Sequence, residues 1–367
     1  MSKELNKYRF LFAGGGTGGH LYPAIAVAEE IKKLKPEAEI LFIGSKNKIE
    51  GDVVPKLGFN FKDIIVRGFS RKISYKTFLF PLYLIISLLQ SLVITMKFKP
   101  KVALGTGGYV AGPAIWAASV MGSKVILVEP NSYPGITTRL LEKYADEVHI
   151  NFEYTKQFLR RQNILKLTGN PIRSSLKITD KSDALRKFDL TESKKTLLIL
   201  GGSLGAQSIN IAIEKNLDNL LKNQIQLIWQ VGKNYFENYS KYHSKECKVF
   251  AFIENMSEAF SACDLVIARA GASTISEIAL LGLPSVLIPS PNVAENHQYH
   301  NAKALADNNA AILVEDKNLG KEFYDIIIKT LYDQNLLNDL SINIKKFAKP
   351  DASYQIAKNA INYIELN

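Results

Sequence analysis

Cysteine is scarce in this sequence of 367 residues, which contains only Cys247 and Cys263. Two cysteines are too few for a disulfide framework, and no CxxC or Cys/His spacing indicates a zinc site. The opening residues, MSKELNKYRF, contain no apolar run of the kind found in a secretory signal. These absences favour a reducing, cytoplasmic location, with both cysteines serving as small buried hydrophobic residues.

Acidic residues are also missing from one long stretch, because none occurs from position 64 to position 128. Residues 1–170 contain 24 Lys and Arg against 13 Asp and Glu, whereas residues 171–367 contain 22 of each. The whole net charge of +11 therefore belongs to the first half. An evenly basic surface is excluded, and the first half is predicted to face an anionic partner, either nucleic acid or a membrane surface.

The length of the chain predicts two domains, because one hydrophobic core rarely serves more than ~250–300 residues. Short apolar runs alternate with helical patterns, which indicates an α/β protein with two doubly wound, Rossmann-like domains facing a cleft. A stretch rich in Gly and Pro at 168–173 marks the junction, giving domains at 1–168 and 169–342. The predicted strands are residues 8–13, 40–43, 101–104, 124–128, 147–150, 196–200, 225–230, 248–252, 265–268, 285–288 and 311–313.

The first predicted strand ends in the glycine-rich turn AGGGTGGH at 13–20. Such a turn lets backbone N–H groups approach an anionic or polar ligand. A dinucleotide site would need a carboxylate at the end of the second strand, where LFIGSK has none, and no Gly-Lys-Ser/Thr completes a P-loop. NAD is therefore disfavoured. His20 either takes a proton from a sugar hydroxyl or simply bonds to backbone at the start of a helix.

Further glycine turns follow later strands. The turn GTGGYVAGP at 105–113 is explained most simply by close packing of strand and helix. In the second half, GGSLGAQ at 201–207 offers backbone N–H groups and the Ser203 hydroxyl to a phosphate. Glu277, in ARAGASTISE, either holds the hydroxyls of a ribose or caps its helix. The polar loop PSPNVAENHQ at 289–298 suits recognition of sugar hydroxyls.

Seven motifs occur in a fixed order: GGGTGGHLYPA, GTGGYVAGP, EPNSYPG, GNPIR, GGSLGAQSIN, ARAGASTISE and AENHQ. Together, over residues 8–360, they resemble glycosyltransferase family 28, the peptidoglycan β-N-acetylglucosaminyltransferases that convert lipid I to lipid II. The resemblance implies a GT-B fold without cofactor or metal. The first domain would bind the lipid-linked acceptor and the second UDP-GlcNAc, and a helix at 343–367 would return to the first domain.

The resemblance also implies roles for particular residues in an inverting transfer. His20 would be the base that deprotonates the acceptor C4 hydroxyl. Substrate binding would fall to Thr17, Gly18, Gly19, Asn131, Arg173, Ser203, Ile253, Ala272, Ser273, Thr274, Ile275, Ser276, Glu277 and Gln298. Among these, Asn131 and Gln298 would read the GlcNAc, Arg173 and Ser203 would serve the diphosphate, and Ile253 would pack against uracil. Two departures, Pro130 and His297 where the family commonly has glutamine, loosen the expected sugar contacts.

The acid-free stretch surrounds an apolar segment at 78–96. A helix at 81–97 would be ~25 Å long, short of the ~30 Å hydrocarbon core, which favours a peripheral helix over a spanning one. As a crossover between the second and third strands it would bury one face on the sheet, with Ser87, Ser91 and Thr95 giving it a weakly polar side. The predicted membrane-docking residues are Arg71, Lys72, Lys76, Phe78, Leu79, Phe80 and Leu82. The alternative is an internal helix with solvated lysines.

The expected partners are UDP-GlcNAc, undecaprenyl-linked lipid I, anionic lipids of the bacterial inner membrane at its cytoplasmic face, and other cell-wall synthesis proteins. The closest rival is a related glycosyltransferase that transfers from a UDP-sugar to diacylglycerol. A nucleic-acid-binding protein is disfavoured, because the basic residues flank apolar sequence and form no known DNA- or RNA-binding motif. A nicotinamide oxidoreductase is weakened by the missing acid after the second strand.

Overall fold

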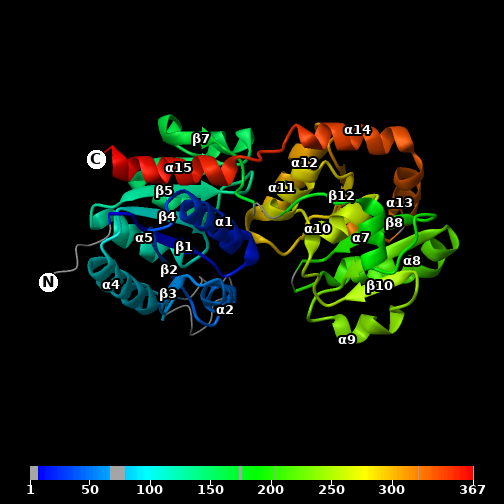
Figure 1. Ribbon diagram of the computed structural model, residues 1–367, viewed down its shortest axis with the longest axis horizontal. Coiled ribbons are helices and arrows are strands. Elements are labelled where there is room, and N and C mark those ends of the chain that lie inside the picture. Colours follow the sequence, from blue (N-terminus) through cyan, green and yellow to red (C-terminus); the bar gives the residue numbers. More distant parts are fainter. Residues whose placement is uncertain (1–6, 67–78, 173–175, 203, 321, 367) are drawn as a thin grey trace. The chain divides into compact units, whose positions relative to one another are not determined.

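A computed structural model describes residues 7–66, 79–172, 176–202, 204–320 and 322–366 of the chain (Figure 1). The chain divides into two compact units, the first formed by Met1–Arg173 with Lys349–Asn367 and the second by Ser174–Ala348. These breaks lie a few residues beyond the expected boundaries at 168 and 342. Each unit contains one parallel β-sheet covered by helices on both faces, which gives the predicted α/β class of two doubly wound domains.

The first unit has a seven-stranded sheet in the order β3-β2-β1-β4-β5-β6-β7. Alternate residues of the central strand β1 point to opposite faces, as a pleated strand requires. Phe10 and Phe12 pack in one core cluster with α1 and α15, whereas Leu11 and Ala13 pack in another with α5. The elements of this unit are β1 Arg9–Gly14, α1 Gly18–Leu34, β2 Glu39–Gly44, α2 Ile49–Lys56, β3 Asn60–Asp63, α4 Phe80–Phe98, β4 Val102–Gly107, α5 Ala111–Val120, β5 Lys124–Glu129, α6 Ile136–Leu141, β6 Glu147–Ile150, β7 Leu165–Leu167 and α15 Ala352–Glu365.

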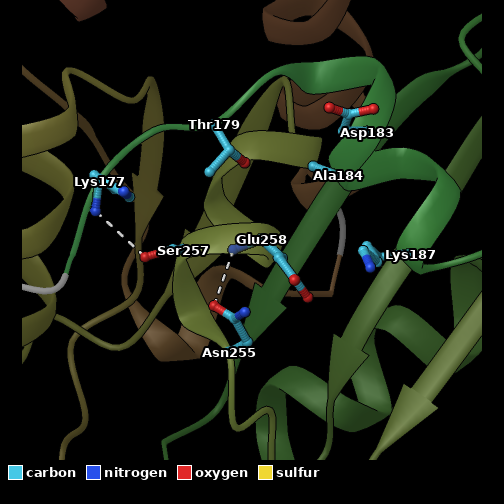
Figure 2. Close-up of a pocket in the computed structure, with 8 residues that line it drawn as sticks. All are labelled: Lys177, Thr179, Asp183, Ala184, Lys187, Asn255, Ser257 and Glu258. Carbon is cyan, nitrogen blue, oxygen red and sulfur yellow. Dashed lines mark hydrogen bonds between the residues drawn. The ribbon is translucent and has the colours of Figure 1, made fainter.

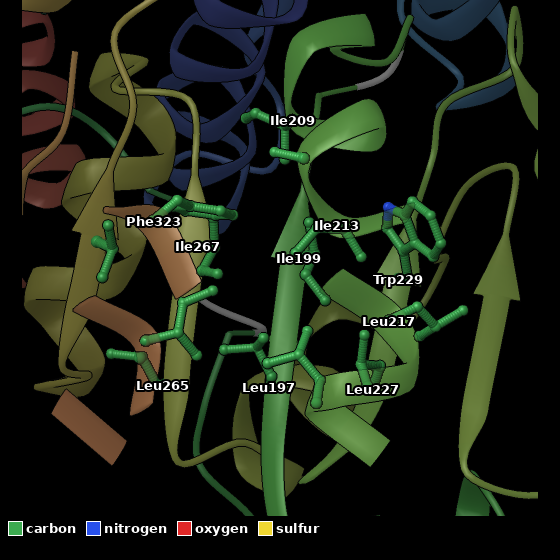
Figure 3. Close-up of a cluster of buried hydrophobic side chains, with 14 of the residues drawn as sticks. Leu197, Ile199, Ile209, Ile213, Leu217, Leu227, Trp229, Leu265, Ile267 and Phe323 are labelled. Atoms are coloured by element: carbon green, nitrogen blue, oxygen red, sulfur yellow. The ribbon is translucent and has the colours of Figure 1, made fainter. Parts of the chain in front are cut away.

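The second unit has a six-stranded sheet in the order β10-β9-β8-β11-β12-β13. Helix α8 buries an apolar stripe at helical spacing, including Ile209, Ile213 and Leu217, against Trp229 and the other inward residues of the sheet (Figure 3). The elements of this unit are α7 Lys181–Lys187, β8 Lys195–Leu200, α8 Gln207–Lys222, β9 Ile225–Gln230, α9 Phe236–Tyr239, β10 Cys247–Phe250, α10 Met256–Ala262, β11 Leu265–Ala268, α11 Ala272–Leu281, β12 Ser285–Leu287, α12 His297–Ala306, β13 Ile312–Leu313, α13 Phe323–Tyr332 and α14 Gln334–Lys345.

The C-terminal helix α15 completes the core of the first unit, although the chain reaches it through the second. Ile356, Ala357 and Ala360 are fully buried in the cluster that contains Phe10 and Phe12. The helix packs beside α1 (Figure 1). Helix α14, immediately before it, belongs to the second unit.

All eleven predicted strands are present, and two further strands, β3 and β7, were not predicted. Because β3 precedes α4, this helix connects the third and fourth strands rather than the second and third. The sheet order leaves both unpredicted strands at the two edges of the first sheet.

Candidate functional site

The glycine turn after β1 lies at the point where the strand order of the first sheet reverses. Strand β1 has β2 on one side and β4 on the other, so the turns after β1 and β4 are neighbours. In doubly wound sheets, ligands bind at such switch points, beyond the carboxyl ends of the strands. Thr17 immediately precedes α1, and Gly18 and Gly19 are the first two residues of that helix.

His20, in the first turn of α1, is fixed by two hydrogen bonds to Thr106 at the end of the neighbouring strand β4. Its Nδ1 lies 3.0 Å from the Thr106 carbonyl oxygen, and the Thr106 hydroxyl donates to the His20 carbonyl oxygen at 2.6 Å. A carbonyl can only accept, so Nδ1 carries the proton and the neutral ring has its lone pair on Nε2. Burial lowers the pKa of His20 below its usual value, opposed by the Thr106 hydrogen bond and the negative charge of Glu50.

Two glycines, Gly107 at the end of β4 and Gly108 in the turn after it, allow this close approach. A Cβ atom on Gly107 would lie 2.7 Å from His20 Nδ1, and one on Gly108 would lie 2.3 Å from the Gly15 carbonyl oxygen. Both glycines have positive φ angles, +100° and +82°. The second glycine turn therefore packs closely against the first, with Gly107 against His20 and Gly108 against Gly15.

Sequence reasoning missed Glu50, a carboxylate that bonds to the first glycine turn. It is 2% exposed and accepts hydrogen bonds from the backbone N–H groups of Gly16, at 2.8 Å, and Ser45, at 3.1 Å. Its position in the first turn of α2 looks like that of an ordinary N-terminal acid, so the sequence contains no signal that separates the two roles.

Asn131 lies in a loop organised by the buried Glu129, the last residue of β5. One Glu129 oxygen accepts from the Asn131 backbone N–H at 3.0 Å and from its side-chain amide at 3.2 Å. The other accepts from Gly135 N–H at 3.0 Å and from the Thr138 hydroxyl at 2.6 Å. Burial raises the pKa of Glu129, although all four hydrogen bonds act to lower it. The Thr137 hydroxyl donates to the Gly108 carbonyl at 3.3 Å, so this loop is tied to the turns around His20.

The second unit has the same kind of reversal between β8 and β11. Gln230, at the end of β9, joins two of its predicted ligand-binding segments, because its amide donates to the Gly202 carbonyl at 3.3 Å and its carbonyl accepts from Ile253 N–H at 2.8 Å. The Ile253 side chain is 4% exposed. Ser203 and Arg173, the predicted diphosphate residues, lie outside the described residues. Gln230 was not predicted from the sequence as a site residue.

Helix α11 contains six predicted site residues, and their side chains differ in environment. Ala272, Ile275 and Ser276 are buried, and the Ser276 hydroxyl donates to the Ala272 carbonyl at 2.9 Å. Ser273, Thr274 and Glu277 are partly exposed. The Ser273 Oγ is itself buried and has no hydrogen-bond partner among the described residues. A hydroxyl in that state, in the first turn of a helix, is suited to a ligand that supplies the missing bond.

Gln298 stabilises the loop after β12, which was predicted to bind sugar hydroxyls. Its side-chain carbonyl accepts a hydrogen bond from Ser290 N–H at 2.9 Å. Glu295 and Asn296 both have positive φ angles, +51° and +53°. Consecutive left-handed residues without glycine are strained, and such strain is concentrated at functional loops.

Helix α4 buries its weakly polar side. The stripe of Ser87, Ser91 and Thr95 is fully buried, and α4 packs on the alanine-rich α5 through it. The outward face is apolar, with 45–58% exposure of Leu82, Ile85, Leu89, Val93 and Met96. Small side chains let two helices approach closely, which is why the polar stripe faces inward.

Of the predicted docking residues, Leu79 and Leu82 are exposed and Phe80 is partly exposed. Arg71, Lys72, Lys76 and Phe78 lie outside the described residues. Lys97, Lys99 and Lys101, at the far end of the helix, are exposed. Within the described ranges, α4 is the one helix long and apolar enough to cross a membrane by length and composition, with 19 residues.

A separate polar pocket of about 350 Å³ lies in the second unit (Figure 2). Its lining residues are Lys177, Thr179, Asp183, Ala184, Lys187, Asn255, Ser257 and Glu258. None of them is a predicted site residue, and the lining mixes charges of both signs. Across the part of the chain that the structure describes, no group of three or more His, Cys, Asp or Glu side chains is placed to hold a metal ion.

Comparison with known proteins covers both units. Residues 10–150 match the model of the glycosyltransferase family 28 N-terminal domain, and residues 196–356 match that of the family 28 C-terminal domain. The chain is 43% identical, over 98% of its length and 99% of the relative's, to the UDP-N-acetylglucosamine–N-acetylmuramyl-(pentapeptide) pyrophosphoryl-undecaprenol N-acetylglucosamine transferase of Flavobacterium psychrophilum. It is 40% identical to the enzyme of the same name from Parabacteroides distasonis, over 98% of this chain and 100% of that one.

Solved structures agree with these relatives. The crystal structure of Acinetobacter baumannii MurG aligns with a TM-score of 0.76 at 25% identity, covering 97% of this chain and 100% of that one. The glycosyltransferase SnogD of Streptomyces nogalater aligns with a TM-score of 0.66 at 14% identity, covering 98% and 100%, which shows a shared fold.

Proposed function

This chain belongs to glycosyltransferase family 28, and from that premise we propose how its residues carry out the transfer. The enzyme has the GT-B fold and moves N-acetylglucosamine from UDP-GlcNAc to undecaprenyl-pyrophosphoryl-MurNAc-pentapeptide, converting lipid I to lipid II in peptidoglycan synthesis. The reported relatives name this muramyl acceptor and not diacylglycerol, and family membership removes the nucleic-acid and nicotinamide alternatives.

The first unit binds the acceptor and contains the base. His20 is the candidate because Nδ1–H is committed to the Thr106 carbonyl and leaves the lone pair on Nε2. Its lowered pKa keeps the ring neutral near pH 7, as a general base must be. In an inverting transfer, Nε2 takes the proton of the acceptor C4 hydroxyl as that oxygen attacks the anomeric carbon. This arrangement at His20 is the observation that carries the proposal.

The second unit binds the donor. The supporting features are the glycine turn after β8, the Ser273 hydroxyl in the first turn of α11, which has no partner among the described residues, and the partly exposed Glu277 one turn further. Backbone N–H groups and hydroxyls at helix starts stabilise a leaving diphosphate. Arg173 and Ser203 are proposed to complete this stabilisation. Glu277 is proposed to hold the ribose and Gln298 the GlcNAc.

The His20 assignment is tested with His20→Gln in a lipid I to lipid II assay at saturating substrates. Loss of a base lowers kcat by roughly 100-fold or more, with UDP-GlcNAc binding unchanged. His243→Gln is the matched control, because the His243 ring also bonds to backbone but lies in the second unit. Wild-type turnover of His20→Gln would show that another group is the base.

The acceptor is a membrane lipid, so the enzyme acts at a membrane. We propose that α4 docks the first unit on the cytoplasmic face of the inner membrane. The support is its outward apolar face, with basic side chains in the sequence on both sides. Apolar side chains contribute burial in the lipid boundary, and lysines and arginines contribute attraction to anionic headgroups.

Vesicle sedimentation tests the docking proposal. Leu82→Ser with Leu89→Ser is expected to weaken binding to anionic vesicles by about tenfold or more, because two exposed leucines lose their apolar surface. Leu140→Ser is the control, since Leu140 is 65% exposed on α6 and outside α4. Equal binding of the wild type to neutral and anionic vesicles would exclude the electrostatic contribution.

A further inference from the structure

Glu50 is a buried carboxylate that none of the assignments above uses. Each of its oxygens accepts a backbone N–H from a different turn, Oε2 from Gly16 at 2.8 Å and Oε1 from Ser45 at 3.1 Å. The side chain therefore connects the turn after β1 with the turn after β2. The Gly16 backbone N–H, in the loop beside the candidate base, thus already donates to a protein carboxylate and is not available to a substrate.

The two turns are shaped around this side chain. A Cβ atom on Gly15 would lie 2.4 Å from Glu50 Cδ, and one on Gly44 would lie 2.5 Å from Glu50 Cγ. Neither contact is possible for a real side chain, so both positions need glycine to admit the carboxylate. An ordinary first-turn acid on a helix surface has no such surroundings.

Glu50 also carries the negative charge that acts on His20. Around the ring, the end of β4 provides the Thr106 carbonyl and hydroxyl and the backbone of Gly107, none of which titrates. Within the described residues, the ionisable group that acts on the ring is Glu50, from α2. When His20 becomes an imidazolium, its Nδ1–H still faces a neutral carbonyl, and the Glu50 carboxylate is the negative group among the described residues that favours the charged ring.

We propose that Glu50 is a positioning residue of the transfer reaction, which holds the glycine turn in its bonded shape and balances the charge on His20 when the imidazolium forms. The inference rests on the proposed role of His20. In the step, the acceptor O–H proton passes to Nε2, the acceptor oxygen bonds to the anomeric carbon, and the bond from that carbon to UDP breaks. Glu50 takes no part in the bond changes and acts through the glycine turn and the His20 ring.

The experiment compares Glu50→Gln with Asp52→Asn by steady-state kinetics between about pH 5.5 and 9. Asp52 lies two residues away on α2 and is exposed, so its variant removes the same unit of charge without touching the glycine turn. Glu50→Gln is expected to lower kcat by roughly tenfold and to move the acid limb of kcat/KM to lower pH, with the KM for UDP-GlcNAc unchanged. Asp52→Asn is expected to match the wild type.

Glu50→Asp, which keeps the charge on a shorter side chain, is expected to keep the wild-type acid limb while losing part of kcat. The pKa of the ring itself is measured by NMR titration, since the chain contains only five histidines and His20→Gln identifies the resonance. A lower imidazole pKa in Glu50→Gln than in the wild type supports the charge-balancing role independently of turnover.

A wild-type kcat and acid limb in Glu50→Gln, in a protein where His20→Gln is inactive, would overturn the Glu50 inference alone. Full activity of His20→Gln would overturn the base assignment and with it the charge-balancing role. In the double variant, Glu50→Gln is expected to cost little beyond His20→Gln, because residues that act as a unit are not additive. Additive losses would contradict coupling between the two residues.

Discussion

The two units end their central strands in similar glycine turns, but they satisfy the polar groups there differently. In the first unit, His20, Thr106 and Glu50 are hydrogen-bonded to other protein groups around the turns after β1, β2 and β4. In the second unit, the Ser273 Oγ has no partner among the described residues. The hydrogen bonds that hold the first turn are made without a ligand, whereas Ser273 gains a hydrogen bond when a ligand arrives.

The difference matches the two halves of the reaction. A base must be held at a fixed distance and in a fixed tautomer before the acceptor binds, and internal hydrogen bonds provide this. A nucleotide site gains more from groups whose hydrogen bonds are still to be made, because each new bond adds to binding. With the roles proposed above, one fold used twice in a chain provides a preorganised turn for the base and a binding turn that a ligand completes.

The largest expected effect comes from closing the space around His20. Gly107→Ala places a Cβ 2.7 Å from His20 Nδ1 at a φ of +100°, whereas Gly202→Ala, at a φ of +83°, meets no atom of the described residues within 4 Å, its chain neighbours aside. Strain and overlap together should lower the free energy of unfolding by about 3 kcal/mol or more for Gly107→Ala, against about 1 kcal/mol for Gly202→Ala.

Each unit contains one of the two tryptophans, Trp116 and Trp229, so fluorescence of single-tryptophan variants follows the unfolding of the units separately. Gly107→Ala should destabilise only the unit that contains Trp116. Equal losses for the two glycine variants would contradict the contrast between an interlocked turn and an open one.

The second expected effect is a loss of stability of the first unit at acid pH. Burial opposes ionisation of Glu147, but hydrogen bonds and charges from His149 and Lys166 outweigh it and lower the pKa of Glu147 to about 2. A lowered folded-state pKa adds stability above the unfolded value of ~4.3, and this stability is lost as the pH falls through about 2. Because Lys166 is 42% exposed, solvent screening reduces the contribution to about 2 kcal/mol at neutral pH.

Glu147→Gln should therefore destabilise the first unit at pH 7 and flatten its stability between pH 4.5 and 2, as measured by urea unfolding at several pH values. Asp146→Asn is a neighbouring control that alters a different ion pair, with Lys124. The Trp229 signal should not change in either variant. A steep acid dependence retained in Glu147→Gln would assign the acid sensitivity to another group.

The smallest expected effects compare the Thr106 hydroxyl, which is hydrogen-bonded, with the Ser273 hydroxyl, which has no partner among the described residues. Thr106→Val removes the 2.6 Å bond to the His20 carbonyl and should cost about 1–2 kcal/mol of unfolding free energy. Ser273→Ala removes a hydroxyl without a partner among the described residues, so stability should stay within about 0.5 kcal/mol. Calorimetry should instead show UDP-GlcNAc binding weakened by about five- to tenfold. Unchanged donor affinity would remove Ser273 from the donor site.

The sequence predicted every strand that is buried on both faces, because such strands need continuous apolar runs. The two that it missed, Asn60–Asp63 and Leu165–Leu167, are the edges of the first sheet. An edge strand is covered less completely, and the residues of β3 are largely exposed. Their sequence therefore resembles that of a loop. In the second sheet even the edges were predicted, since Val249 in β10 and Ile312 in β13 belong to apolar runs.

Two features of the candidate site depend on tertiary contacts that the sequence does not encode locally. Glu50 reaches Gly16 across 34 positions of the chain, so nothing beside either residue reveals the pair. The stripe of Ser87 and Ser91 was predicted as a stripe, but the sequence did not say which side it takes; it is buried, because the small residues of α5 accept it closely. A local polarity pattern fixes the faces of a helix; its neighbours decide which face is inward.

Because the core of the first unit includes α15, that unit cannot finish folding in the order in which it is synthesised. When residue 173 leaves the ribosome, Phe10 and Phe12 still lack the face that Ile356, Ala357 and Ala360 will cover. The whole second unit, Ser174–Ala348, is made in between. The sheet of the nascent first unit therefore stays partly uncovered until α15 has been translated and packs on it.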